Sequence, residues 1–229
     1  MERRSFPKPP TGFKPCRSTS EFAAVPQRFV NVPFDPAYEP LFEALVFTIF
    51  ACGYRVRCTL EDSDSGDIRL DKLVELIRES PRSVNDLSPI EPGENELPRF
   101  NMPFELGLAL GAKRFGRRPR DRIKIMVGQR YKLPAHLSDL GGNDPDAHEN
   151  QPDKVIRIVR NHLQRSPRGG MLAGPTKLAA DFAAFKARLP AIAQGIDFQP
   201  DEVRGYADYP TFAWCVTRYL TEPMILDDN

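Results

Sequence analysis

Apolar and polar residues follow two different periods along the first half of the chain. Four short runs with the pattern of strands are found at 28–33, 54–60, 83–87 and 122–127. Apolar residues at helical spacing fall between them, at 38–52, 68–79 and 101–112. Strands that alternate with helices favour a parallel sheet joined by right-handed crossovers. We therefore predict an α/β fold, a flavodoxin-like doubly wound parallel sheet of four to five strands with a C-terminal helical extension.

The two ends of the chain have patterns of their own. The segment 1–27 is rich in proline and carries scattered charges, so we expect an arm that lies outside the core. Helical patterns continue after the sheet, at 153–164, 176–189 and about 199–220. We place the α/β domain at 28–165 and the helical extension at 166–229.

Composition narrows the classes of function only a little. The chain has 229 residues and a net charge of +1, which gives no overall bias toward nucleic acid or membranes. Its four cysteines contain no C-x-x-C pair, so we expect no zinc ribbon and no metal. The longest apolar run, from Leu41 to Cys52, includes Glu43 and is too short to span a bilayer. We expect a cytoplasmic protein without a membrane partner.

A ligand site is expected at one edge of the predicted sheet. Open parallel sheets bind ligands outside the carboxyl ends of their strands, where the strand order reverses. In a flavodoxin-like order this point lies between the first and third strands. The candidate binding residues near it are Pro33, Phe34, Asp35, Tyr38, Asp86, Ser88, Asn101 and Met102. Glu105, about one turn into the helix that begins at Asn101, is the catalytic candidate.

Spacing alone leaves the role of Glu105 open. A carboxylate near a helix N-terminus can act as a nucleophile, as a base, or as a clamp for a hydroxylated ring. The alternative is that Glu105 complements the helix dipole or closes a capping box with Met102 or Asn101. In the same way, Asp86 is either a ligand-binding or a turn aspartate, and Phe34 either lines a site or fills the core.

Three motifs together resemble a known family. They are Phe29-Val30-Asn31-Val32-Pro33-Phe34, then Asp86 after a short strand, then Asn101-Met102-Pro103-Phe104-Glu105-Leu106-Gly107-Leu108-Ala109-Leu110-Gly111. This order resembles the nucleoside 2-deoxyribosyltransferase-like superfamily, which is structurally related to the Toll/interleukin-1-receptor-like NAD-cleaving domains. The resemblance covers about residues 28–128. Where the deoxyribosyltransferases usually have Asp-Gly before the helix, this chain has Phe100-Asn101.

The resemblance implies chemistry at an N-glycosidic bond. Glu105 matches the family's glutamate, which acts at the anomeric carbon of a ribose or deoxyribose, and Asp86 matches a ligand-binding aspartate. Phe34 and Asp35 fall in the first substrate loop. The resemblance also implies that NAD or another nucleotide is the substrate, with no separate cofactor.

Two other functions remain open. The same pocket could hold a nucleotide as a signal without turnover, while the C-terminal helices engage a protein partner. A weaker hypothesis assigns nucleic-acid binding to the basic run 113–122, for which a solvated loop is the alternative. His148 lies in a polar loop that is either a lid or a plain connection. Association with further copies of the chain stays open.

Overall fold

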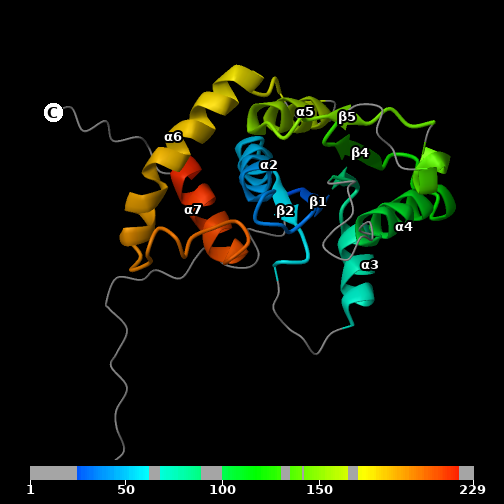
Figure 1. The fold of residues 1–229 in the computed structure, drawn as a ribbon, viewed down its shortest axis with the longest axis horizontal. Helices are drawn as coiled ribbons and strands as arrows, with labels where there is room; N and C mark the ends of the chain where they lie inside the picture. The colour runs from blue at the N-terminus through cyan, green and yellow to red at the C-terminus, as the bar shows by residue number, and fades with distance from the viewer. Residues whose placement is uncertain are drawn as a thin grey trace, which may run out of the picture.

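A computed structural model describes residues 25–61, 68–88, 100–129, 135–140, 142–164 and 170–221 of the chain. Residues 1–24 of the predicted proline-rich arm lie outside the described residues, as do 222–229 of the predicted extension. Within the described ranges the chain forms a sheet with helices on both faces and a further pair of helices on one side (Figure 1).

The sheet confirms the predicted fold class. Its five strands are β1 (Gln27–Asn31), β2 (Arg55–Arg57), β3 (Arg82–Asp86), β4 (Arg122–Val127) and β5 (Asp146–Ala147). They are all parallel and lie in the order β2-β1-β3-β4-β5, which is the flavodoxin-like order. The strand order reverses where β1 pairs with β3, with Val30 opposite Val84. The predicted place for a ligand site therefore exists in the fold.

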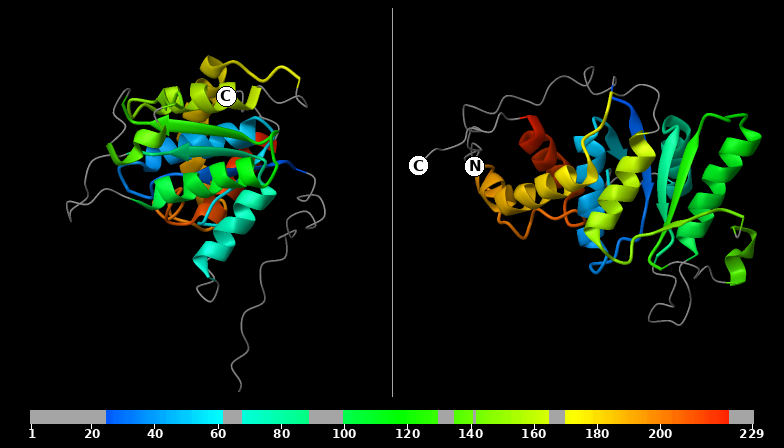
Figure 2. Two further views of the ribbon diagram at one scale, coloured as in Figure 1. Left: turned by 90° about the vertical axis from the view of Figure 1, so that its right-hand side faces the viewer. Right: turned by 90° about the horizontal axis from the view of Figure 1, so that it is seen from above.

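Two layers of helices cover the sheet (Figure 2). Helices α2 (Glu39–Ala51) and α5 (Pro152–Gln164) pack against each other on one face. Helices α3 (Arg69–Glu79) and α4 (Asn101–Phe115) pack together on the other face. Because side chains alternate along a strand, each strand supplies apolar residues to both layers.

The core on the α2 and α5 face is the larger of the two. Val30 and Val84 at the centre of the sheet lie in it together with the buried residues of both helices. Phe29, one residue before Val30, packs instead with buried residues of α3 and α4. Nine consecutive residues of α2, from Leu41 to Ile49, are buried because this helix lies between the sheet and the C-terminal helices.

The C-terminal extension consists of two helices that pack on α2, namely α6 (Pro175–Gln194) and α7 (Tyr209–Thr221). The rings of Phe47 in α2 and Phe185 in α6 stack with their centroids 5.4 Å apart. These helices form a third layer outside the α2 and α5 face (Figure 1). The extension is therefore helical, as predicted.

Two boundaries differ from the sequence-based expectation. Helix α7 begins at Tyr209 rather than near 199, because Asp208 caps it through the N–H of Thr211 at 3.1 Å. Helix α6 continues five residues past the expected end at 189, through Pro190. Pro190 has no N–H and so removes one hydrogen bond from the helix, but burial of Ala193 in the main core stabilises the last turn.

The region between β4 and α5 was expected to be a loop. It contains a 3₁₀ segment (Ala135–Leu140) and the two-residue strand β5, in which Asp146 pairs with Met126. No helix among the described residues is both long enough and apolar enough to cross a membrane.

Candidate functional site

The start of α4 is fixed to the point where the strand order reverses. Asn31 is the last residue of β1, and its Nδ2 donates to the carbonyl of Met102 at 3.1 Å and to Oδ1 of Asn85 at 3.3 Å. Asn85 in turn donates to Ser83 at 2.9 Å. These amide side chains are buried, so the helix that carries Glu105 is held at the carboxyl edge of β1 and β3.

The sheet divides the predicted site residues between its two faces. Asn85 and Asp86 are neighbours in β3, so their side chains point to opposite faces. Asn85 contacts Asn31 beneath α4, whereas Asp86 contacts Tyr38 on the side of α2. Glu105 therefore lies on one face of the sheet and Asp86 on the other, rather than in one continuous group.

Glu105 lies deeper in its helix than a capping residue would. Helix α4 has Phe100 at its N-cap, has no acidic residue in its first turn, and forms no side-chain capping bond. The capping-box alternative is therefore wrong. Glu105 is 7% exposed, and its Oε1 lies 4.0 Å from an Nη of Arg69 at the start of α3.

The Glu105 carboxylate has little to offset its removal from water. Within the described residues it accepts no hydrogen bond, and Arg69 is its one charged neighbour. Burial raises the pKa of Glu105 above its ordinary value, and the charge of Arg69 opposes part of that rise. Buried carboxylates are usually hydrogen-bonded, and an exception with a perturbed pKa is a candidate functional group.

The first turn of α4 offers few free donors to an anion. Pro103 has no N–H, and the N–H of Phe104 already donates to the carbonyl of Phe100 at 3.0 Å. Only the N–H groups of Asn101 and Met102 are left for a ligand in this turn. Asn101 is exposed, whereas the side chain of Met102 packs in the small core formed with Leu106.

Asp86 is the centre of a buried cluster, which we call the Asp86 network: Tyr38, Asp86, Ser88 and His148. Oδ1 of Asp86 accepts from the N–H of Ser88 at 2.9 Å and from its hydroxyl at 2.5 Å. Oδ2 accepts from the hydroxyl of Tyr38 at 2.5 Å and lies 3.0 Å from Nε2 of His148. Asp86 is fully buried, so a ligand could contact its carboxylate only by replacing one of these partners.

The partners of His148 fix its tautomer. Its Nδ1 accepts from the N–H of Asn150 at 3.0 Å, so the proton of the neutral ring is on Nε2. That nitrogen faces both Asp86 and Ser88, each at 3.0 Å. The ring has no free nitrogen that could take a proton from the Ser88 hydroxyl, so the cluster lacks the geometry of a serine nucleophile with its base.

Burial helps to maintain the hydrogen bond between Tyr38 and Asp86 in this network. Burial and the adjacent Asp86 carboxylate raise the pKa of Tyr38 well above its ordinary value, so its hydroxyl keeps its proton and donates. The rings of Tyr38 and His148 meet edge to face with centroids 6.1 Å apart. His148 was not among the predicted site residues. Its position directly after an Asp-Ala pair gave no periodic signal, because β5 is only two residues long.

The loop after β1 contacts the C-terminal extension. The carbonyl of Pro33 accepts from the hydroxyl of Tyr206 at 2.7 Å, and the ring of Phe34 meets that of Tyr206 edge to face at 5.6 Å. Asp35 before Pro36 is a pattern typical of a helix N-cap, but α2 begins at Glu39, and the Asp35 carbonyl accepts the N–H of Tyr38 in a turn. Phe34 also packs against the main core.

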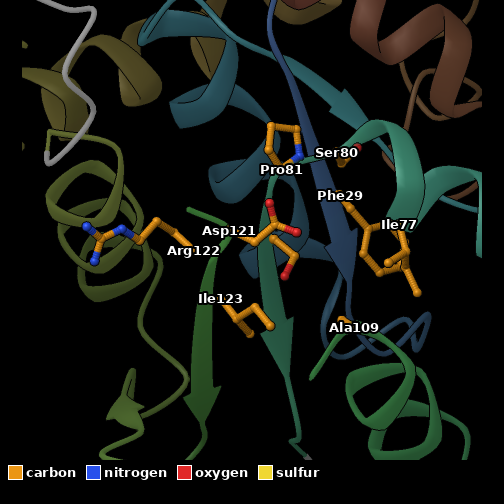
Figure 3. Close-up of a pocket in the computed structure, with 9 residues that line it drawn as sticks. Phe29, Ile77, Ser80, Pro81, Ala109, Asp121, Arg122 and Ile123 are labelled. Atoms are coloured by element: carbon orange, nitrogen blue, oxygen red, sulfur yellow. The ribbon is translucent and has the colours of Figure 1, made fainter. Parts of the chain in front are cut away.

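A shallow hollow lies at the other end of the sheet (Figure 3). It is lined by Phe29, Ile77, Ser80, Pro81, Ser83, Ala109, Asp121, Arg122 and Ile123. Most of these residues belong to the amino ends of β3 and β4 or lie just before them, so the hollow is separate from the Glu105 edge.

No group of three metal-ligating side chains is found in the described ranges. No protein-family model, curated protein or solved structure matches the chain.

Proposed function

We propose that this protein cleaves or transfers the N-glycosidic bond of a nucleotide, with NAD as the preferred substrate and Glu105 as the catalytic carboxylate. The observation that carries the proposal is the largely buried carboxylate of Glu105, which accepts no hydrogen bond from the described residues and lies beside the carboxyl edge of β1 and β3. Doubly wound sheets bind ligands at this edge. The motif resemblance implies the same residue and the same bond.

The chemistry suits an ionised carboxylate. When the bond between ribose C1′ and the nicotinamide nitrogen breaks, its electron pair goes to the nitrogen and neutralises the pyridinium charge. C1′ then carries the positive charge of an oxocarbenium-like transition state, which a nearby carboxylate stabilises. The new bond to C1′ forms either directly from an incoming nucleophile, or first from the carboxylate, in which case the nucleophile then displaces the carboxylate from C1′. Water as the nucleophile gives hydrolysis and releases a proton to solvent, whereas a second nucleobase gives transfer.

The neighbours of Glu105 have supporting roles in this proposal. Arg69 favours the ionised form of the carboxylate, because its positive charge opposes the effect of burial on the pKa of Glu105. The 33–35 loop, Asn101 and Met102 would hold the sugar and phosphate. The Asp86 network would mainly hold the ends of β3 and β5 in place, since each oxygen of Asp86 already has two partners.

The substrate can be found by incubating the protein with NAD and with a panel of nucleosides and nucleoside monophosphates. Release of free base from one of them is the expected result, and it should be lost in Glu105→Gln. If the wild-type protein and the variant are equally inert on every member of the panel, the enzymatic proposal is wrong.

A second candidate is a nucleotide sensor that binds without turnover. The observation in its favour is the direct contact of Tyr206 in the C-terminal extension with both Pro33 and Phe34 of the predicted substrate loop. A ligand that moved this loop would move the surface of the extension as well. Saturable nucleotide binding without any base release would favour this function over the first.

A further inference from the structure

Three arginines form a row across the sheet at the end opposite to Glu105. Arg82 of β3 pairs with Arg122 of β4, and the pairing of Phe29 with Ser83 places Arg28 of β1 beside Arg82. Each arginine precedes a residue that faces α3 and α4, so all three side chains leave the sheet on the α2 and α5 face. In Figure 3 the side chain of Arg122 points away from the hollow on the other face. We call Arg28, Arg82 and Arg122 the arginine row.

The row passes from the interior to solvent. Arg28 is 3% exposed, Arg82 is half-buried and Arg122 is exposed. Like charges on adjacent strands repel each other, and burial adds a cost to the two inner ones. Burial lowers the pKa of Arg28 to about 10, and the charge of Arg82 acts in the same direction. Burial also lowers the pKa of Arg82, and Arg122 contributes to that shift.

The protein itself does little to balance these charges. No carboxylate forms an ion pair with the row in the part of the chain that the structure describes, whereas Arg57 pairs with Glu61 and Glu79, and Arg118 pairs with Asp121. Arg28 donates to the carbonyl of Gln27 at 2.6 Å and lies 3.7 Å above the ring of Tyr54. Nε of Arg28 and one Nη of Arg82 are buried and have no hydrogen-bond partner. Buried donors of this kind normally have one.

We propose that the arginine row is an anion site that binds a phosphate group at the amino-terminal edge of the sheet. A single carboxylate is satisfied by one guanidinium, whereas a phosphate presents enough oxygens for donors from several. Arg122 would bind the phosphate from the solvent side. Arg28 and the buried Nη of Arg82 would act from the interior mainly through their charge. This site does not depend on the proposed reaction, because it lies at the other end of the strands from Glu105.

Titration calorimetry at constant ionic strength tests this inference, with inorganic phosphate and pyrophosphate as probes and acetate as the carboxylate probe. The variants are Arg82→Gln and Arg122→Gln. Arg114→Gln is the matched control, since it removes the same charge from the exposed end of α4, outside the row. We expect saturable binding of phosphate or pyrophosphate that weakens about tenfold or more in each row variant and stays unchanged in the control.

Three results would overturn the inference. They are no saturable binding of either phosphate probe to the wild-type protein, equal weakening in all three variants, or acetate binding as tight as that of phosphate. Arg122 is exposed, so its substitution keeps the test valid even if Arg82→Gln does not fold. Base release by the wild-type protein tests the proposed function separately, and neither outcome decides the other.

Discussion

The carboxylate of Glu105 and the guanidinium of Arg69 lie 4.0 Å apart, between the second turn of α4 and the start of α3. The Arg69 side chain is 69% exposed, whereas that of Glu105 is 9% exposed, so the pair is screened on one side only. At this distance the two groups attract each other without forming a hydrogen bond. Glu105 is thus a poor contributor to stability, which makes its substitution informative.

Replacing the Glu105 carboxylate by an amide should not destabilise the fold. Glu105→Gln removes a largely buried charge that accepts no hydrogen bond from the described part of the chain, so we expect the free energy of unfolding to stay the same or to rise by up to about 1 kcal/mol. Urea unfolding at neutral pH measures this quantity. The control is Glu43→Gln, because Glu43 is also buried but accepts from Lys186 at 2.5 Å. That variant should lose about 1–3 kcal/mol. A similar loss in Glu105→Gln would mean that its carboxylate is structural.

The stability difference between the wild type and Glu105→Gln should depend on pH. The folded-state pKa of Glu105 is raised, mainly by burial, so the folded protein binds the proton more tightly than the unfolded chain does. The wild type therefore gains stability relative to the variant as pH falls toward the ordinary carboxyl pKa, and loses it as pH rises through the raised value. Unfolding curves across this range measure the difference. The stability of the variant relative to the wild type should therefore grow as pH rises. If it falls instead, the pKa of Glu105 is not raised in the folded protein.

The Asp86 network should matter for stability. Tyr38→Phe removes the donor to Oδ2 of Asp86 in a site without water access, and we expect a loss of about 1.5–3 kcal/mol in the free energy of unfolding. Tyr219→Phe is the control, because Tyr219 of α7 is only partly buried and contacts Phe185 of α6 through its ring. Equal effects of the two substitutions would show that the hydrogen bond to Asp86 adds nothing.

Docking of the C-terminal extension on α2 depends on close approach at Gly205. A Cβ at this position would lie 2.8 Å from the ring of Phe42 and 3.1 Å from Cγ of Glu43. Gly205→Ala should therefore cost about 1–3 kcal/mol in the free energy of unfolding. Gly107→Ala is the control, since nothing lies within 4 Å of its added Cβ and an alanine in mid-helix should add about 0.5–1 kcal/mol. A neutral Gly205→Ala would mean that the extension is loosely attached.

The sheet was predictable from sequence because its signals are local. The apolar alternation in β4, from Arg122 to Val127, and the helical spacing in α3 give the elements directly, and their order restricts the topology. β5 was missed because two residues carry no period. The strand order then placed the end of β1 next to the start of α4, where Asn31 contacts Met102.

The arrangement of the candidate site was less predictable. The sequence predicted that Asp86 and Glu105 lie at the same edge of the sheet. The face on which the Asp86 side chain lies depends on the register of β3, and a shift of one residue would move that side chain to the opposite face. The contact of Asp86 with His148 joins residues 62 positions apart across two strands, through a turn in which Glu149 and Asn150 have positive φ. Tyr206 and Pro33 are even farther apart in sequence, so no local pattern indicates their contact.

The central claim is that the Glu105 carboxylate acts at an anomeric carbon, and the most direct test is nicotinamide release from NAD by the wild type and by Glu105→Gln, with NAD binding measured on both. We expect the wild type to release nicotinamide, and the variant to bind NAD with similar affinity while its release falls by about 100-fold or more. Release at the same rate by both proteins, or NAD binding without release by the wild type, would contradict the claim.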